Sequence, residues 1–120
     1  MRVTFSPNEH LQNLIAELRR VANKEKVMIW KRIAADLSKP SRQRREINLT
    51  RINANTKDND TIVVPSKVLS SGEIDHKVQV APFSFSKNAK DKITRSKGAA
   101  ISINELLKSN PKGNKIRIIG

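Results

Sequence analysis

The most constraining feature of the sequence is a basic stretch from Lys31 to Asn53 that is interrupted at Pro40. Proline disfavours helical geometry in the residue before it, so a helix that enters this stretch must end near Lys39. Apolar residues return at helical spacing only after a run of arginines. The pattern therefore predicts two helices separated by a cationic segment. Seven basic residues of the stretch face only two acidic ones, Asp36 and Glu46.

The whole chain is strongly cationic. Its 120 residues include 24 Lys and Arg against 11 Asp and Glu, which gives a net charge of +13 and a pI of about 10.7. Such a balance repels itself in the compact state and favours a polyanionic partner over a merely soluble basic surface. Charge alone does not distinguish DNA from RNA. Aromatic residues make up only 3% of the chain, which disfavours readers that stack bases on a sheet.

Length and composition suit a single domain, residues 1–120, with one modest core of Ile, Leu, Val and Ala. Cysteine is absent, which excludes disulfides and the usual structural zinc sites and favours an intracellular protein. No apolar run approaches the roughly 20 residues of a membrane-spanning helix, and no signal-peptide pattern opens the chain. The only two histidines have no metal-ligand spacing.

The first part of the chain, residues 1–56, reads as helical. Ser6 and Glu9 form a capping box around Pro7. Trp30 falls within an apolar stripe, which favours a core position over nucleotide stacking. The predicted helices cover residues 7–22, 26–37 and, with Asn48 as a possible cap, about 47–54.

The second part, residues 57–120, reads as a small, irregular α/β unit. A buried strand over residues 61–64 is expected to end at Pro65, and residues 67–69 form a second short strand or a turn. Ser86 and Ser102 each predict a helix start, with Gly98 as the stop of the first helix. Strands that alternate with helices favour parallel pairing. The remaining predicted strands are residues 78–85, with an edge or bulge at Pro82, 99–101 and 115–119.

The strongest functional signal is the group Arg42, Arg44 and Arg45, called here the arginine cluster. Arginine presents a planar fork that can bind phosphate oxygens in pairs, so these residues favour a phosphate contact over a merely solvated surface. The loop at Ser70–Gly72 lacks the spacing of a nucleotide-binding P-loop, but its backbone amides could meet a phosphate. An ordinary turn is the alternative there.

The case for an enzyme is weak. Asp75 and His76 are neighbours, but adjacency does not supply the nucleophile, base and orienting group that catalysis needs. His76 is better interpreted as a loop histidine that contacts a phosphate or a backbone carbonyl.

Several segments, in order and spacing, resemble the archaeal-type large-subunit ribosomal protein eighteen-e, a relative of bacterial-type protein fifteen. The chain departs from the glycine-rich loop of that family at Ser66 and Ser70, where glycines are expected. The matching segments are residues 29–34, 39–42, 46–49, 60–65, 67–69 with Gly72, 85–86, 110–113 and 117–120.

The resemblance implies an α/β fold in which N-terminal helices pack beside an irregular β-β-α superhelix-like unit with a small, mostly parallel sheet. It implies a structural constituent of the large ribosomal subunit that binds its ribosomal RNA and stabilises RNA packing during translation. The implied partners are large-subunit ribosomal RNA and neighbouring ribosomal proteins in the cytoplasmic ribosome. No catalysis, cofactor, metal, membrane, small-molecule substrate or obligate homo-oligomer is expected.

The alternative is a small, chromatin-type DNA-binding protein, which the same cations would serve. The residues expected to bind RNA are Lys31, Arg32, Lys39, Arg42, Arg44, Arg45, Asn48, Arg51, Lys67, Ser70, Ser71, Gly72, His76, Lys77, Lys112 and Lys115.

Overall fold

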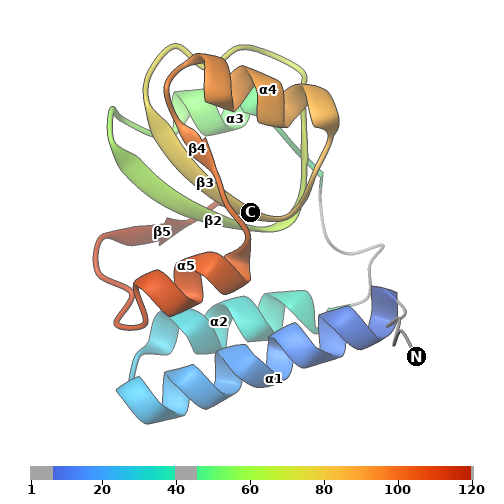
Figure 1. The fold of residues 1–120 in the computed structure, drawn as a ribbon, viewed down its shortest axis with the longest axis vertical. Coiled ribbons are helices and arrows are strands. Elements are labelled where there is room, and N and C mark those ends of the chain that lie inside the picture. The colour runs from blue at the N-terminus through green and yellow to red at the C-terminus, as the bar shows by residue number, and fades with distance from the viewer. Residues whose placement is uncertain (1–6, 40–45, 120) are drawn as a thin grey trace, which may run out of the picture.

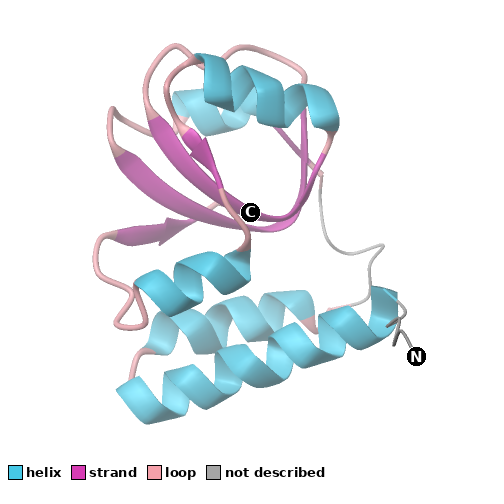
Figure 2. Cartoon of the chain, in the orientation of Figure 1, coloured by secondary structure: helices cyan, strands magenta, loops and turns pink. Residues whose placement is uncertain are grey.

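The computed structural model describes residues 7–39 and 46–119. In these ranges a small sheet lies between two helical layers (Figure 1). Helices α3 and α4 cover one face, and α1, α2 and α5 cover the other (Figure 2). The elements are α1 (Pro7–Glu25), α2 (Met28–Leu37), β1 (Ile47–Asn48), α3 (Leu49–Ala54), β2 (Asp60–Leu69), β3 (Val78–Phe85), α4 (Lys87–Arg95), β4 (Ala99–Ala100), α5 (Ile103–Ser109) and β5 (Ile116–Ile118).

All strand pairings among the described residues are parallel. The long strand β2 is central: β3 pairs along one edge, while β5 and β1 share the other edge, at its first and second halves respectively. The two-residue strand β4 pairs with the far side of β3. The prediction of an α/β fold with helices beside a small, mostly parallel sheet is confirmed.

Alternation along β2 divides the apolar residues into two clusters. Ile62 and Val64 pack with the residues of α3 and α4, whereas Val63 packs with α1, α2 and α5. Because successive side chains of a strand point to opposite faces, a single apolar run of β2 serves both layers. The N-terminal helices therefore share a core with the sheet.

The prediction that the strand ends at Pro65 was wrong, because β2 continues to Leu69. Proline has no N–H for a ladder hydrogen bond, and the pairing with β3 shifts register between Val64 and Lys67. The irregularity lets the strand pass Pro65 and Ser66, which are both buried. The expected edge at Pro82 fits the end of β4, whose pairing stops at Val80.

Helix ends also differ from prediction. Helix α1 continues to Glu25, where Lys26 adopts a positive φ of 56° and Val27 N–H donates to the Ala22 carbonyl. At the end of α4 the residue with positive φ is Lys97, not Gly98. Gly98 is needed for a different reason: a Cβ there would lie 2.3 Å from the Val78 carbonyl oxygen. Helix α2 begins at Met28, two residues later than expected.

The predicted caps at Ser86 and Ser102 are confirmed, since each hydroxyl accepts a hydrogen bond from the backbone N–H three residues later. Asn48 precedes α3, but its side chain makes no capping bond, and Ile47 and Asn48 form a short strand instead of a helical turn. The Ser6 cap lies outside the described residues.

Trp30 is a core residue, as predicted. Its side chain is fully buried, and its Nε1–H donates a 2.7 Å hydrogen bond to the Pro111 carbonyl. Burial of the ring and satisfaction of its one donor tie α2 to the turn that precedes β5.

Candidate nucleic-acid interface

The structure divides the predicted RNA-binding residues into two main groups. The first, the α2 group, lies on α2 and on the turn between α5 and β5, and comprises Lys31, Arg32, Lys39, Lys112 and Lys115. The second, the α3 group, lies around the start of α3 and the loop after β2, and comprises Asn48, Arg51, Ser70, Ser71 and Gly72. The arginine cluster lies between Lys39 and Glu46, outside the described residues. In sequence it joins the two groups.

The α2 group is exposed and nearly free of counter-charges. Within the described ranges, Lys31 and Arg32 have no ion-pair partner, whereas Lys39 pairs with Asp36 at 3.3 Å. The turn that carries Lys112 is held against α2, because Trp30 binds Pro111 and a Cβ on Gly113 would lie 2.7 Å from the Ile29 side chain. A surface of unpaired cations attracts polyanions without the cost of breaking internal salt bridges.

The α3 group is organised by hydrogen bonds between a helix start and a loop. The Thr50 N–H donates to the Ser71 carbonyl at 3.1 Å. The Lys92 ammonium donates to the carbonyls of Ser70 and Gly72 at 3.0 and 2.9 Å and pairs with Glu73 at 3.1 Å. The carbonyls of this loop therefore point inward, toward α3 and α4.

The N–H groups of Ser71 and Gly72 have no acceptor among the described residues. Gly72 has a φ of +96°, and a Cβ there would lie 2.7 Å from the backbone nitrogen of Thr50. Only glycine suits this combination of left-handed backbone and close approach. Consecutive N–H groups in such a turn can bind an anion, so the geometry is compatible with a phosphate contact.

His76 lies at the opposite end of α3 and holds the loop before β3. Its Nδ1 lies 2.8 Å from the Asp75 carboxylate, and its Nε2 lies 2.7 Å from the hydroxyl of Thr56. Thr56 Oγ1 also lies 2.7 Å from the carbonyl of Ile52, in the last turn of α3. Both ring nitrogens therefore have protein partners, which gives His76 a structural role; its predicted contact with RNA stays a prediction.

A hydroxyl, an imidazole and a carboxylate in this order have the composition of a catalytic triad. Thr56, however, is 9% exposed and the His76 side chain is 16% exposed, so a substrate has little access to the hydroxyl. The chain of hydrogen bonds closes the end of α3 instead.

Lys67 and Lys77 are the remaining predicted residues, and both are exposed. Lys67 lies on β2 just after its irregularity, opposite Ser84 of β3. Lys77 precedes β3, where its N–H binds the Asp58 carboxylate. The structure thus places Lys67 and Lys77 on different elements and does not bring them together with the Ser70–Gly72 loop into one binding pocket.

Two cations with defined contacts were missed by sequence reasoning. Lys92 anchors the Ser70–Gly72 loop, and Arg117 pairs with Asp60 at 3.3 Å. Lys92 comes three residues after the buried Ala89, on a helix that was read as mostly solvated. That spacing places it at the margin of the buried face and was the available signal.

Replacement of Lys92 by Met should loosen the Ser70–Gly72 loop. The substitution keeps the aliphatic stem but removes three contacts of the ammonium group, so we expect a loss of about 1–3 kcal/mol in the free energy of unfolding. Urea unfolding and amide hydrogen exchange of residues 70–73 would measure the effect. The control is Lys90→Met on the same helix, at an exposed position. Equal stability and exchange in the two variants would contradict the assigned role.

Acid should weaken the Asp75–His76–Thr56 link. Hydrogen bonds from His76 and Asn53 hold the pKa of Asp75 below its usual value. A carboxyl whose pKa is lower in the folded chain stabilises it above the ordinary value of about 4, and this contribution is lost as pH falls through the folded-state pKa. Asp75→Asn should therefore flatten the acid limb of unfolding free energy against pH. Asp91→Asn, at an exposed position on α4, is the control, and equal limbs in both variants would refute the link.

Further tests of composition give no competing site. No helix of the described residues is long and apolar enough to cross a membrane. The same residues contain no group of three or more His, Asp or Glu side chains placed to hold a metal ion.

Comparison with known proteins agrees with this picture of a small basic α/β protein. A family model for the ribosomal proteins 50S-L15 and 50S-L18e and their 60S counterpart matches residues 9–102. Two similar relatives, both named large ribosomal subunit protein eL18, come from Methanothermobacter thermautotrophicus (40% identical, 99% of this chain and 98% of the relative) and Methanoregula boonei (41%, 98% of each). A third with the same name, from Sulfurisphaera tokodaii, is 44% identical over 88% of this chain and 90% of its own length.

The chain belongs to this family of large-subunit ribosomal proteins. Its similarity to the archaeal eL18 relatives extends over nearly the whole chain, so the resemblance drawn from the sequence motifs is confirmed.

Proposed function

We propose that the chain is a structural constituent of the large ribosomal subunit that binds large-subunit ribosomal RNA and has no catalytic activity. The observation that carries the proposal is the pair of exposed, cationic or amide-bearing groups on α2 and α3, joined in sequence by the arginine cluster, in a chain of net charge +13. Family membership supports the ribosome as the place of action, and with it ribosomal RNA and neighbouring ribosomal proteins as partners.

The two groups suggest how binding works. The cations of the α2 group would neutralise phosphates of one RNA segment, and the Ser71 and Gly72 amides would donate to a phosphate oxygen of another. The sheet and the Trp30 contact hold the two groups at a fixed separation, so the protein would favour one arrangement of the two RNA segments. Shape and backbone contacts of this kind suit folded RNA.

Competition at equal salt tests the nucleic acid preference. The full-length chain is bound to labelled large-subunit ribosomal RNA, and unlabelled structured RNA or duplex DNA of equal phosphate concentration is added. We expect structured RNA to displace the label at a concentration at least tenfold lower than that of DNA. Equal or better competition by duplex DNA would contradict the proposal and favour a chromatin-type protein.

A further inference from the structure

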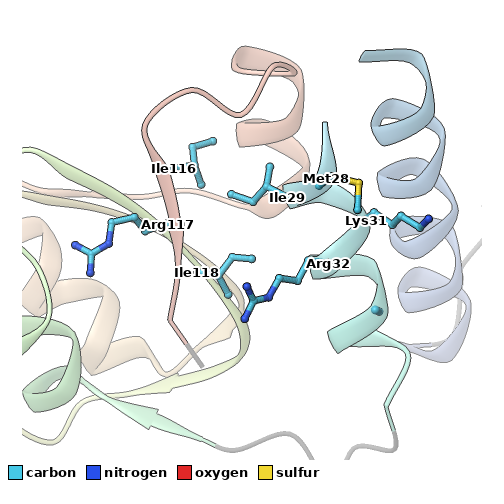
Figure 3. Close-up of a pocket in the computed structure, with 8 residues that line it drawn as sticks. Met28, Ile29, Lys31, Arg32, Ile116, Arg117 and Ile118 are labelled. Atoms are coloured by element: carbon cyan, nitrogen blue, oxygen red, sulfur yellow. The ribbon is translucent and has the colours of Figure 1, made fainter. Parts of the chain in front are cut away.

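A groove of about 740 Å³ opens between α2 and β5. In Figure 3 the side chains of Ile29, Ile116 and Ile118 approach one another across it from the helix and the strand. The guanidinium of Arg32 reaches from α2 to lie beside Ile118. The lining residues are Met28, Ile29, Lys31, Arg32, Ala35, Ile116, Arg117 and Ile118.

The groove combines an uncovered apolar surface with positive charge. Met28 is 72% exposed and is the single large apolar residue of the described ranges with a mostly exposed side chain. The lining contains three cations and no carboxylate. Arg117 points away from the groove and pairs with Asp60, whereas Arg32 has no ion-pair partner among the described residues. A ligand complementary to this lining has a flat apolar face and carries negative charge.

We propose that the α2–β5 groove holds an unpaired nucleotide of the bound ribosomal RNA, an inference that rests on the proposed function. The base lies against Ile29 and Ile118, and the planar guanidinium of Arg32 stacks on its face. Arginine planes and apolar side chains receive unstacked RNA bases in this manner, and no aromatic residue is required. Lys31, one residue before Arg32 on the exposed part of α2, is available to the adjoining phosphates.

An extended peptide is the competing occupant. The outer edge of β5 has no partner strand in the described part of the chain, so a peptide could pair with it. The charge of the lining favours the nucleotide, because a peptide backbone is neutral and leaves the guanidinium of Arg32 without a counter-ion. The test below distinguishes the two.

The substitution Arg32→Lys separates stacking from charge. It keeps the positive charge but removes the planar guanidinium, so we expect about tenfold weaker binding of the full-length chain to large-subunit ribosomal RNA with an unchanged slope of log K against log salt. Arg95→Lys, at an exposed position on α4 outside the groove, is the matched control and should bind as the unmodified chain does.

Crosslinking locates the ligand. The complex is formed with RNA that contains 4-thiouridine and is irradiated, and adducts are mapped by mass spectrometry. We expect an adduct within residues 28–32 that joins an unpaired nucleotide. Unaltered affinity of Arg32→Lys, adducts at residues 28–32 only from paired nucleotides, or a crosslink from Met28 to another ribosomal protein in intact subunits would overturn the groove while RNA binding stands. Absence of any RNA binding would overturn the proposed function as well.

Discussion

Replacement of Trp30 by Ala should lower the free energy of unfolding by about 3–5 kcal/mol, the range observed when a large buried ring is removed. The ring is fully buried in the cluster formed by α1, α2, α5 and the sheet. Its loss leaves a cavity and also leaves the Pro111 carbonyl without its 2.7 Å hydrogen bond. A domain of this size has about 5–15 kcal/mol in total, so the variant should be near the limit of folding.

Two controls separate the causes. Trp30→Phe keeps most of the apolar volume but removes the indole N–H, and should cost about 1–2 kcal/mol. Met28→Ala removes a similar amount of aliphatic chain at an exposed position and should change stability by less than about 0.5 kcal/mol. Urea unfolding followed by circular dichroism would measure all three. A Trp30→Ala variant as stable as Met28→Ala would show that the ring is not a core anchor.

Replacement of Arg42, Arg44 and Arg45 together by Ala should reduce the slope of log K against log salt for RNA binding by about 2 to 3, if each residue neutralises one phosphate. Affinity at moderate salt should fall accordingly. Filter binding at a series of salt concentrations gives both quantities. The structure does not describe these residues, so the expectation rests on their position between the α2 and α3 groups.

The matched control removes the same charge elsewhere. Lys87, Lys90 and Arg95 are exposed on α4 and lie outside the predicted RNA-binding set. Replacement of all three by Ala lowers the net charge by the same amount and should change the slope by less than about 1. An unchanged slope in the arginine variant, or equal changes in the two triple variants, would remove the arginine cluster from the contact surface.

Local signals in the sequence predicted much of the fold. Ser86 and Ser102 cap helices because a serine hydroxyl satisfies an N–H of the first turn wherever the helix lies, and the apolar stripe of α2 identified Trp30 as a core residue. Predictions failed where tertiary pairing overrides a local rule. Pro65 does not end β2, because the register shift beside β3 accommodates a residue without an N–H. Lys97 takes the left-handed position that glycine usually fills.

The candidate site was predictable by residue type but not by arrangement. Charge identified the exposed cations of α2, since unpaired lysine and arginine are informative without a fold. Sequence did not show that Lys92 fixes the Ser70–Gly72 loop, because that contact joins residues 20 and 22 positions apart. It also did not show that His76 is occupied by Thr56, or that Met28 and β5 border one groove.

The central claim is that the chain is an integral, RNA-bound component of the large ribosomal subunit. Sedimentation of ribosomal particles from cells that express the tagged full-length chain, followed by a high-salt wash of the isolated subunits, tests it most directly. The account predicts that the chain stays in the large-subunit peak in near-equal amount to other large-subunit proteins and that ribonuclease treatment releases it. Persistent absence of the chain from the large-subunit peak would contradict it.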